Sequence, residues 1–206
     1  MRELTWDVFE ECVAVCGNCA LCAGIRHKVP GQGCRTAPLM LIGEGPGQVE
    51  DEQGLAFVGP AGQLLTRMLA AIGLSREEVY ICNVVKCRPP HNRTPSPEEA
   101  AACLPLLRMQ TALIRPRVIL LLGATAARTV LGPGTSITRV RGLWTERRGV
   151  SILATYHPSA LLRDPAKKRE AWADLQTLRA RLDELGLYPA APGQEPPRDE
   201  TGASGR

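Results

Sequence analysis

The sequence lacks the features that mark membrane, secreted and nucleoside-triphosphate-binding proteins. It has no run of roughly 18 apolar residues, so no membrane-spanning helix is predicted, and its N-terminus has no signal-peptide pattern. The glycine-rich segment Gly43-Glu44-Gly45-Pro46-Gly47 is not followed by the Gly-Lys-Ser/Thr of a P-loop and lacks the spacing of a dinucleotide fingerprint. We therefore expect a cytoplasmic protein with no membrane partner, whose glycine-rich loop binds another kind of ligand.

Lysine is scarce among the basic residues. Of 25 basic residues, 21 are arginine and four are lysine, and the formal net charge is +4. Arginine suits phosphates and flat bases because its planar guanidinium donates hydrogen bonds in a fork. A GC-rich genome would produce the same bias. The charge is thus compatible with a nucleic-acid partner without requiring one.

The eight cysteines indicate a metal site more than a disulfide scaffold, since disulfides are rare in the cytoplasm. Two pairs supply four thiolates to one site, which spacing alone allows to be zinc or an iron–sulfur cluster. Cys22 is the main rival ligand, whereas Cys82, Cys12 and Cys34 are interpreted as small buried hydrophobic residues. The four candidate ligands are Cys16, Cys19, Cys87 and Cys103.

The apolar periodicity predicts an α/β fold. Four short strands alternate with helices, which is typical of a parallel sheet covered on both faces, a three-layer αβα sandwich with a central four-stranded, mainly parallel sheet. The domain is expected to span residues 1–188, and the Pro- and Gly-rich segment 189–206 to be a disordered tail. The strands are predicted at 38–42, 79–85, 117–122 and 150–156, and the helices at 4–16, 62–72, 97–114, 124–131 and 165–185, with a loop at 50–52 and an extended basic segment at 137–144.

Three of these four strands end in unusual residues. The first runs into the glycine-rich loop, the second ends at Asn83, and the fourth ends at His157. Ligands of such sheets bind beyond the carboxyl ends of the strands. The three segments are therefore expected to meet around one ligand.

Four stretches of the sequence resemble the motifs of the family 4 uracil-DNA glycosylases, the iron–sulfur members of the uracil-DNA glycosylase superfamily. The cysteine pattern is similar too, and the resemblance covers roughly residues 12–185 in family order. The four stretches are Gly43-Glu44-Gly45-Pro46-Gly47-Gln48-Val49-Glu50-Asp51, Phe57-Val58-Gly59, Asn83-Val84-Val85-Lys86-Cys87-Arg88-Pro89-Pro90-His91-Asn92-Arg93 and His157-Pro158-Ser159.

The resemblance implies removal of uracil from single- or double-stranded DNA by hydrolysis of the N-glycosidic bond, which leaves an abasic site. It also implies a [4Fe-4S] cluster with a structural role. Uracil-containing DNA would be the partner, and we expect the chain to act as a monomer. A base in a duplex has to be flipped out before it can be cleaved.

Three side chains suit this chemistry. Asn83 can accept from uracil N3–H and donate to O4, the reverse of what cytosine presents. Phe57 can stack on the flipped ring, and His157 can donate to O2, where charge develops as the base leaves. Each has a simpler alternative: a strand-end cap, a core phenylalanine and a turn histidine, respectively.

The group that activates water is left open by the sequence. Some superfamily members carry an aspartate in the first motif, where this chain has Gly45. Glu44 or Glu50 could orient the water instead, or the departing anion and electrostatics could suffice. By resemblance, Glu50 and its loop also lie on the side that excludes the thymine methyl group.

The segment after His157 resembles the loop by which such enzymes enter the minor groove. An apolar wedge, Leu162, followed by Arg163 fits strand-opening proteins. Arg163 and Lys167, with Lys168 and Arg169, could hold phosphates. The alternative is an ordinary solvated helix start.

Three other functions compete with hydrolysis. A covalently linking relative would carry an Arg- and Lys-rich insertion near the histidine motif, and residues 153–157 have none. A non-catalytic single-strand DNA-binding module could use the same pocket. An electron carrier would usually have its cysteines closer together in sequence.

Overall fold

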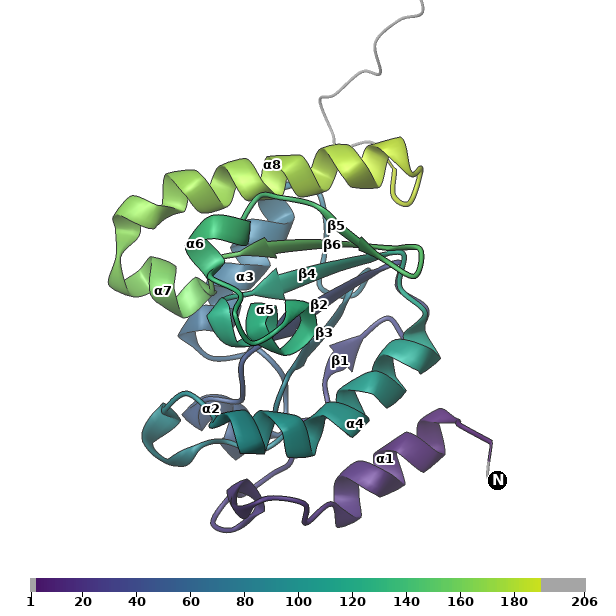
Figure 1. Ribbon diagram of the computed structural model, residues 1–206, viewed down its shortest axis with the longest axis vertical. Helices are drawn as coiled ribbons and strands as arrows, with labels where there is room; N and C mark the ends of the chain where they lie inside the picture. The colour runs from purple at the N-terminus through teal and green to yellow at the C-terminus, as the bar shows by residue number, and fades with distance from the viewer. Residues whose placement is uncertain (1–2, 190–206) are drawn as a thin grey trace, which may run out of the picture.

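The fold is built on one mixed sheet, seen in the computed structural model, which describes residues 3–189 (Figure 1). The strand order is β1-β3-β2-β4-β6-β5, in which the four central strands are parallel and the two edge strands are antiparallel to their neighbours. The strands are β1 Gln32–Gly33, β2 Leu39–Gly43, β3 Tyr80–Asn83, β4 Val118–Leu122, β5 Thr145–Arg147 and β6 Val150–Thr155.

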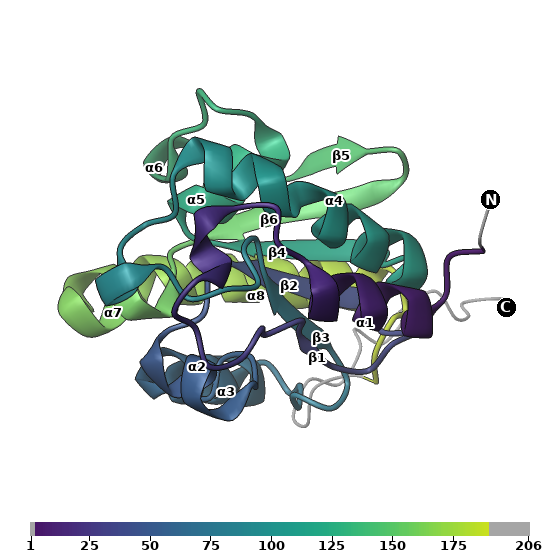
Figure 2. The same cartoon turned by 90° about the horizontal axis from the view of Figure 1, so that it is seen from below.

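Side chains alternate between two apolar layers along the central strands. In β2, Met40 and Ile42 belong to one buried cluster, and Leu39 and Leu41 belong to the other. The first cluster packs under helices α1, α4 and α5, and the second under α3, α7 and α8. Figure 2 accordingly shows α1 and α4 in front of the sheet and α8 behind it. The predicted three-layer αβα sandwich is confirmed.

The helices begin where the local sequence favours a start. Helix α4 has Ser96 as N-cap, with Pro97 at its first position and Glu99 closing a capping box. The helices are α1 Trp6–Val15, α2 Gln48–Gln53, α3 Pro60–Ala71, α4 Pro97–Ile114, α5 Ala124–Leu131, α6 Ile137–Val140, α7 Pro158–Arg163 and α8 Lys168–Glu184. Short 3-10 turns occupy Ala20–Cys22, Pro90–Asn92 and Pro165–Lys167.

All four predicted strands are present as the central parallel strands, and the sheet has two more. The edge strands β1 and β5, of two and three residues, were not predicted because they are too short to show a period. The loop predicted at 50–52 is wrong, since helix α2 covers it. The extended segment predicted at 137–144 is also wrong: it begins with helix α6.

The chain after His157 contains more helix than the sequence predicted. Helix α7 and a 3-10 turn precede α8, where a single helix at 165–185 was expected. Of the predicted disordered tail, residues 190–206 lie outside the described residues. Within residues 3–189, no helix combines the length and the apolarity that crossing a membrane requires.

Candidate active site

A cleft of about 760 Å³ opens at the carboxyl ends of the parallel strands. Its volume lies in the range of small-ligand sites. The three predicted segments all line it, so residues distant in sequence meet around one cavity. Among the lining residues are the predicted side chains Glu44, Gly45, Glu50, Phe57, Asn83, His157, Leu162, Arg163 and Lys167.

Asn83 is the last residue of β3 and is 1% exposed. Its Oδ1 atom is buried and has no hydrogen-bond partner among the described residues. A Cβ atom at Gly43, on the neighbouring strand, would lie 2.5 Å from this oxygen and 2.4 Å from the Phe57 ring. Glycine at the end of β2 thus allows the amide and the aromatic ring to approach each other.

Phe57 occupies a strained backbone conformation, with φ of 53°. Arg76 stabilises it by donating to the carbonyl oxygens of Phe57 (3.0 Å) and Ala56 (2.8 Å). The Phe57 ring lies against the His157 imidazole, with centroids 5.6 Å apart and planes tilted by 35°. No pattern in the sequence singles out Arg76 as a supporting residue.

Glu50 has a structural function in the same loop. Its buried carboxylate accepts hydrogen bonds from the backbone N–H groups of Gly47 (3.1 Å), Val58 (2.9 Å) and Gly59 (2.7 Å). These bonds join the start of α2 to the segment that follows Phe57. The carboxylate therefore fixes the shape of the cleft wall on which Phe57 lies.

His157 is the N-cap of α7, and its ring is held in one tautomer. Nδ1 accepts from the backbone N–H of Ser159 (3.1 Å), so the neutral ring carries its proton on Nε2. Burial, with a smaller contribution from Arg163, lowers the pKa of His157 to about 4, so the imidazole is neutral at pH 7. The Nε2 atom is buried without a partner among the described residues.

Glu44 faces the cleft and accepts a hydrogen bond from the Thr125 hydroxyl at the start of α5. Thr125 was not predicted, because a threonine in the first turn of a helix has no distinctive pattern. Among the candidate water-orienting groups, Glu44 is held by a single side chain, whereas Glu50 is held by three backbone N–H groups.

The predicted DNA-binding residues lie on the rim of the cleft. Leu162, on α7, lines the cleft and is 43% exposed. Lys167 pairs with Asp164 at 2.9 Å and lies 5.7 Å from the centre of the Tyr156 ring. Arg163 is exposed beside Leu162.

A buried ionic network stabilises β6, the strand that leads to His157. No pattern in the sequence predicts this network. Asp174, from α8, accepts from Thr155 Oγ1 (2.6 Å) and from two nitrogens of Arg141 (2.7 and 3.1 Å). Burial raises the pKa of Asp174, and the bonds from Thr155 and Arg141 oppose that shift. Arg141 was predicted to lie in a basic extended segment, and the structure gives it this internal partner.

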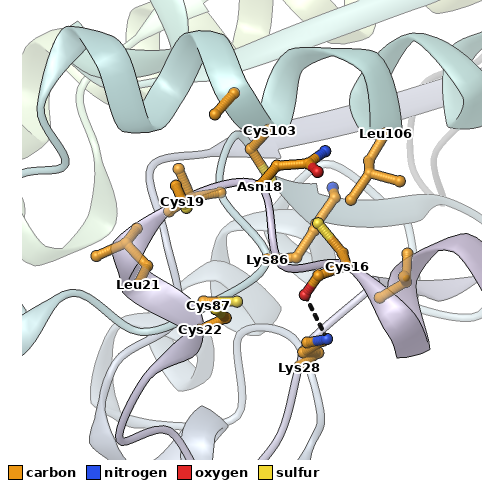
Figure 3. Close-up of a pocket in the computed structure, with 13 residues that line it drawn as sticks. Cys16, Asn18, Cys19, Leu21, Cys22, Lys28, Lys86, Cys87, Cys103 and Leu106 are labelled. Carbon is orange, nitrogen blue, oxygen red and sulfur yellow. Dashed lines mark hydrogen bonds between the residues drawn. The ribbon is translucent and has the colours of Figure 1, made fainter.

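A second, smaller cavity is lined by five of the eight cysteines (Figure 3). Burial raises the pKa of Cys87 to about 12, and burial likewise raises that of Cys103. No three His, Cys, Asp or Glu side chains within residues 3–189 are arranged to hold a single metal ion. The five cysteines are the four predicted ligands, Cys16, Cys19, Cys87 and Cys103, together with the rival, Cys22.

Comparisons with known proteins agree with this geometry. Residues 30–176 match the family model of the uracil DNA glycosylase superfamily. A type-4 uracil-DNA glycosylase of Thermotoga maritima is 47% identical over 90% of this chain and 98% of its own. One from Archaeoglobus fulgidus is 44% identical over 84% of this chain and 90% of its own.

A type-5 uracil-DNA glycosylase is more distant. The one from Pyrobaculum aerophilum is 35% identical over 66% of this chain and 67% of its own. The type-4 relatives match at higher identity and over more of both chains. The chain therefore belongs to the uracil DNA glycosylase superfamily and, within it, to the type-4 uracil-DNA glycosylases.

Proposed function

We propose that this protein is a DNA repair enzyme that removes uracil from DNA by hydrolysing its N-glycosidic bond. One observation carries the proposal. Three buried side-chain nitrogen or oxygen atoms within residues 3–189 lack a partner, and two of them, Asn83 Oδ1 and His157 Nε2, belong to side chains that line this cleft. Buried polar atoms are normally paired. These two unpaired atoms favour a ligand that offers a donor to Asn83 Oδ1 and an acceptor to the Nε2–H of His157.

Uracil supplies that pair. Its N3–H donates to Asn83 Oδ1, and its O2 accepts from the Nε2–H of His157. Cytosine has an acceptor at N3, so it would bring two acceptors together at Asn83, and a buried mismatch of this kind costs up to about 10⁴-fold in selectivity. Phe57, held by Arg76, supplies the surface on which the flipped ring stacks.

Neutral His157 stabilises the leaving group. When the bond from C1′ to N1 breaks, its electron pair goes to the base, and the negative charge is shared with O2. A fixed donor at that oxygen is typically worth about 10²–10³ in rate. Because Nδ1 already accepts from Ser159, the donor at Nε2 is set before the substrate binds.

Water completes the reaction by bonding to C1′ and losing a proton, and we assign its orientation to Glu44. This carboxylate lines the cleft and accepts from Thr125. Leu162, exposed on the rim, fits the role of the wedge that fills the gap left by the flipped base. Arg163 and Lys167 stand beside it as phosphate contacts.

The cysteine cavity fits a [4Fe-4S] cluster, with Cys16, Cys19, Cys87 and Cys103 as its ligands. The donor set supports this assignment, since five thiols surround one cavity. A cluster of several irons also holds its thiolates further apart than a single ion does, which suits thiols that are not arranged around one point. The cluster would supply structural cross-links between α4, the segment after β3 and the segment after α1.

An excision assay tests the function. The protein is incubated with single- and double-stranded oligonucleotides containing one uracil, and the products are treated with alkali. With the wild-type protein, strand breaks are expected at the uracil. No breaks are expected in matched oligonucleotides that contain cytosine or thymine in place of the uracil. DNA retention without breaks would support a binding module instead. A covalent protein–DNA band would support a linking enzyme.

A further inference from the structure

Lys86 is a buried cation that lies between the two sites. It lies in the segment after β3, next to Val85 in the sequence, and it is 1% exposed. Its Nζ atom donates to the backbone carbonyl of Asn83 at 2.7 Å and to Oε1 of Gln110, on α4. The side chain therefore contacts the residue assigned to uracil recognition.

The partners of Lys86 are all neutral. Gln110 is itself fully buried and donates to the Pro30 carbonyl (2.7 Å) and to the Tyr80 hydroxyl oxygen (2.9 Å). Lys86 makes no ion pair with any carboxylate among residues 3–189. A buried charge without a counter-ion is strongly destabilising, so its presence calls for a compensating anion nearby.

The cysteine cavity is where that anion would lie. Lys86 lines it, as does Lys28, whose Nζ donates to the carbonyls of Ala14 and Cys16, both at 2.7 Å. Two of the four lysines of the chain thus line this cavity, and none of the described residues that line it is Asp or Glu. Four thiolates around a [4Fe-4S] core outweigh its positive charge, so the assembly is an anion.

We propose that Lys86 is the buried counter-ion of the cluster and that it connects the cluster to Asn83. The ammonium group compensates the charge of the thiolates on one side and holds the carbonyl at the end of β3 on the other. Lys86 is thus a positioning residue for uracil recognition. This inference depends on the proposed cluster and adds a residue to it. It would give the cluster a physical link to the cleft through the bond from Lys86 to the Asn83 carbonyl, without a part in the reaction.

The test compares Lys86→Met with Gln110→Met. Both variants remove a buried polar group from the same hydrogen-bond network, and only the first removes a charge. Melting temperatures are measured for each protein with the cluster bound and after its removal by chelation and oxidation. Cluster loss leaves the ammonium uncompensated in the wild type and in Gln110→Met, but not in Lys86→Met. We expect the difference in melting temperature between the cluster-bound and the cluster-free protein to be smaller in Lys86→Met than in wild type, by on the order of 10 °C.

The most specific outcome is the direction in which Lys86→Met changes the melting temperature of the cluster-free protein. Cluster-free Lys86→Met should melt above cluster-free wild type, although cluster-bound Lys86→Met melts below its wild-type counterpart. Lys86→Met could instead lower the melting temperature equally in the cluster-bound and the cluster-free protein, as is expected for Gln110→Met. Lys86 would then be only a hydrogen-bond donor, and the proposal would be overturned. Should Lys86→Met be purified without iron, the comparison of the cluster-free proteins decides alone.

The reduction potential of the bound cluster gives a second measurement. Removing a nearby positive charge disfavours the more negative, reduced state, so the potential of Lys86→Met should be lower than that of wild type. Gln110→Met should leave it close to the wild-type value, and an unchanged potential in Lys86→Met would contradict the proposal. Neither measurement uses uracil excision. A wild-type protein that contains iron and sulfide but does not excise uracil would refute the enzyme and leave this inference standing.

Discussion

The cleft and the cysteine cavity lie at the two ends of one short segment, residues 83–87, and they differ in how complete they are. In the cleft, the groups that would bind the base are already fixed: Asn83 by β3, Phe57 by Arg76, and His157 by Ser159. The cavity is lined by buried thiols with raised pKa values and by two lysines, and none of the described residues that line it is Asp or Glu. The cleft is preorganised by the protein, whereas the cavity would be completed by the proposed cluster.

Removing a cluster ligand should produce the largest effect, because it acts on the incomplete site. Cys87→Ala is expected to lose iron and to lower the melting temperature by more than about 10 °C, since metal binding contributes directly to folding. Metal analysis and calorimetry measure both. Cys34→Ala, outside the cavity, is the matched control and should keep its iron. A fully loaded, stable Cys87→Ala protein would remove this cysteine from the ligand set.

Removing a group from the preorganised site should affect rate and leave stability nearly unchanged. Asn83→Ala and His157→Ala are each expected to reduce excision by about 10²–10³-fold under single-turnover conditions. The atoms that face the base have no partner among the described residues, so Asn83→Ala should melt within a few degrees of wild type. His157→Ala also loses the Nδ1 cap of α7 and should melt somewhat lower. Wild-type rates in both variants would refute these roles.

A weaker effect is expected from Arg76, which supports the cleft from behind. Arg76→Met removes the hydrogen bonds to the carbonyls of Ala56 and Phe57, and the strained backbone of Phe57 is then free to relax. We expect a roughly tenfold loss of excision, because a small displacement of a positioning group already reduces rate. Arg67→Met, an exposed arginine on α3, is the control. Equal activity of both variants would show that Phe57 needs no such support.

The smallest effect concerns pH. The pKa of His157 is lowered to about 4 by burial, so the ring stays neutral as the pH falls from 7 to about 5. The rate of single-turnover excision, plotted against pH, should therefore show no transition near pH 6.5. A rate that rises as the pH falls through 6.5 would indicate a protonated catalytic imidazole.

The same shift affects stability with a definite sign. Since the unfolded chain binds a proton at His157 more readily than the folded one, this residue destabilises the fold progressively as the pH falls from about 6.5 toward 4. His157→Asn should show a weaker decline of melting temperature over that interval. Identical declines in both proteins would contradict the assigned shift.

Most of the sheet, and the meeting of three strand ends at the cleft, could be predicted from the sequence, because the signals of the strands and their ends are local. Apolar runs gave the four central strands, and the capping residues Ser96 and Glu99 gave the start of α4. The parallel order brought Asn83 and His157 to one edge. Residues that act through distant partners were not predicted: Arg76 and Asp174 carry no local pattern, and Lys86 was noted only as part of a motif.

The proposed function requires that one uracil satisfies both unpaired atoms of the cleft, Asn83 Oδ1 and His157 Nε2. A crystal structure of the wild-type protein with abasic-site DNA and free uracil tests it directly. We expect N3 of uracil at about 2.7–3.2 Å from Asn83 Oδ1, and O2 at a similar distance from His157 Nε2, with the ring against Phe57. Uracil bound in another cavity, or in this one with either atom still unpaired, would contradict it.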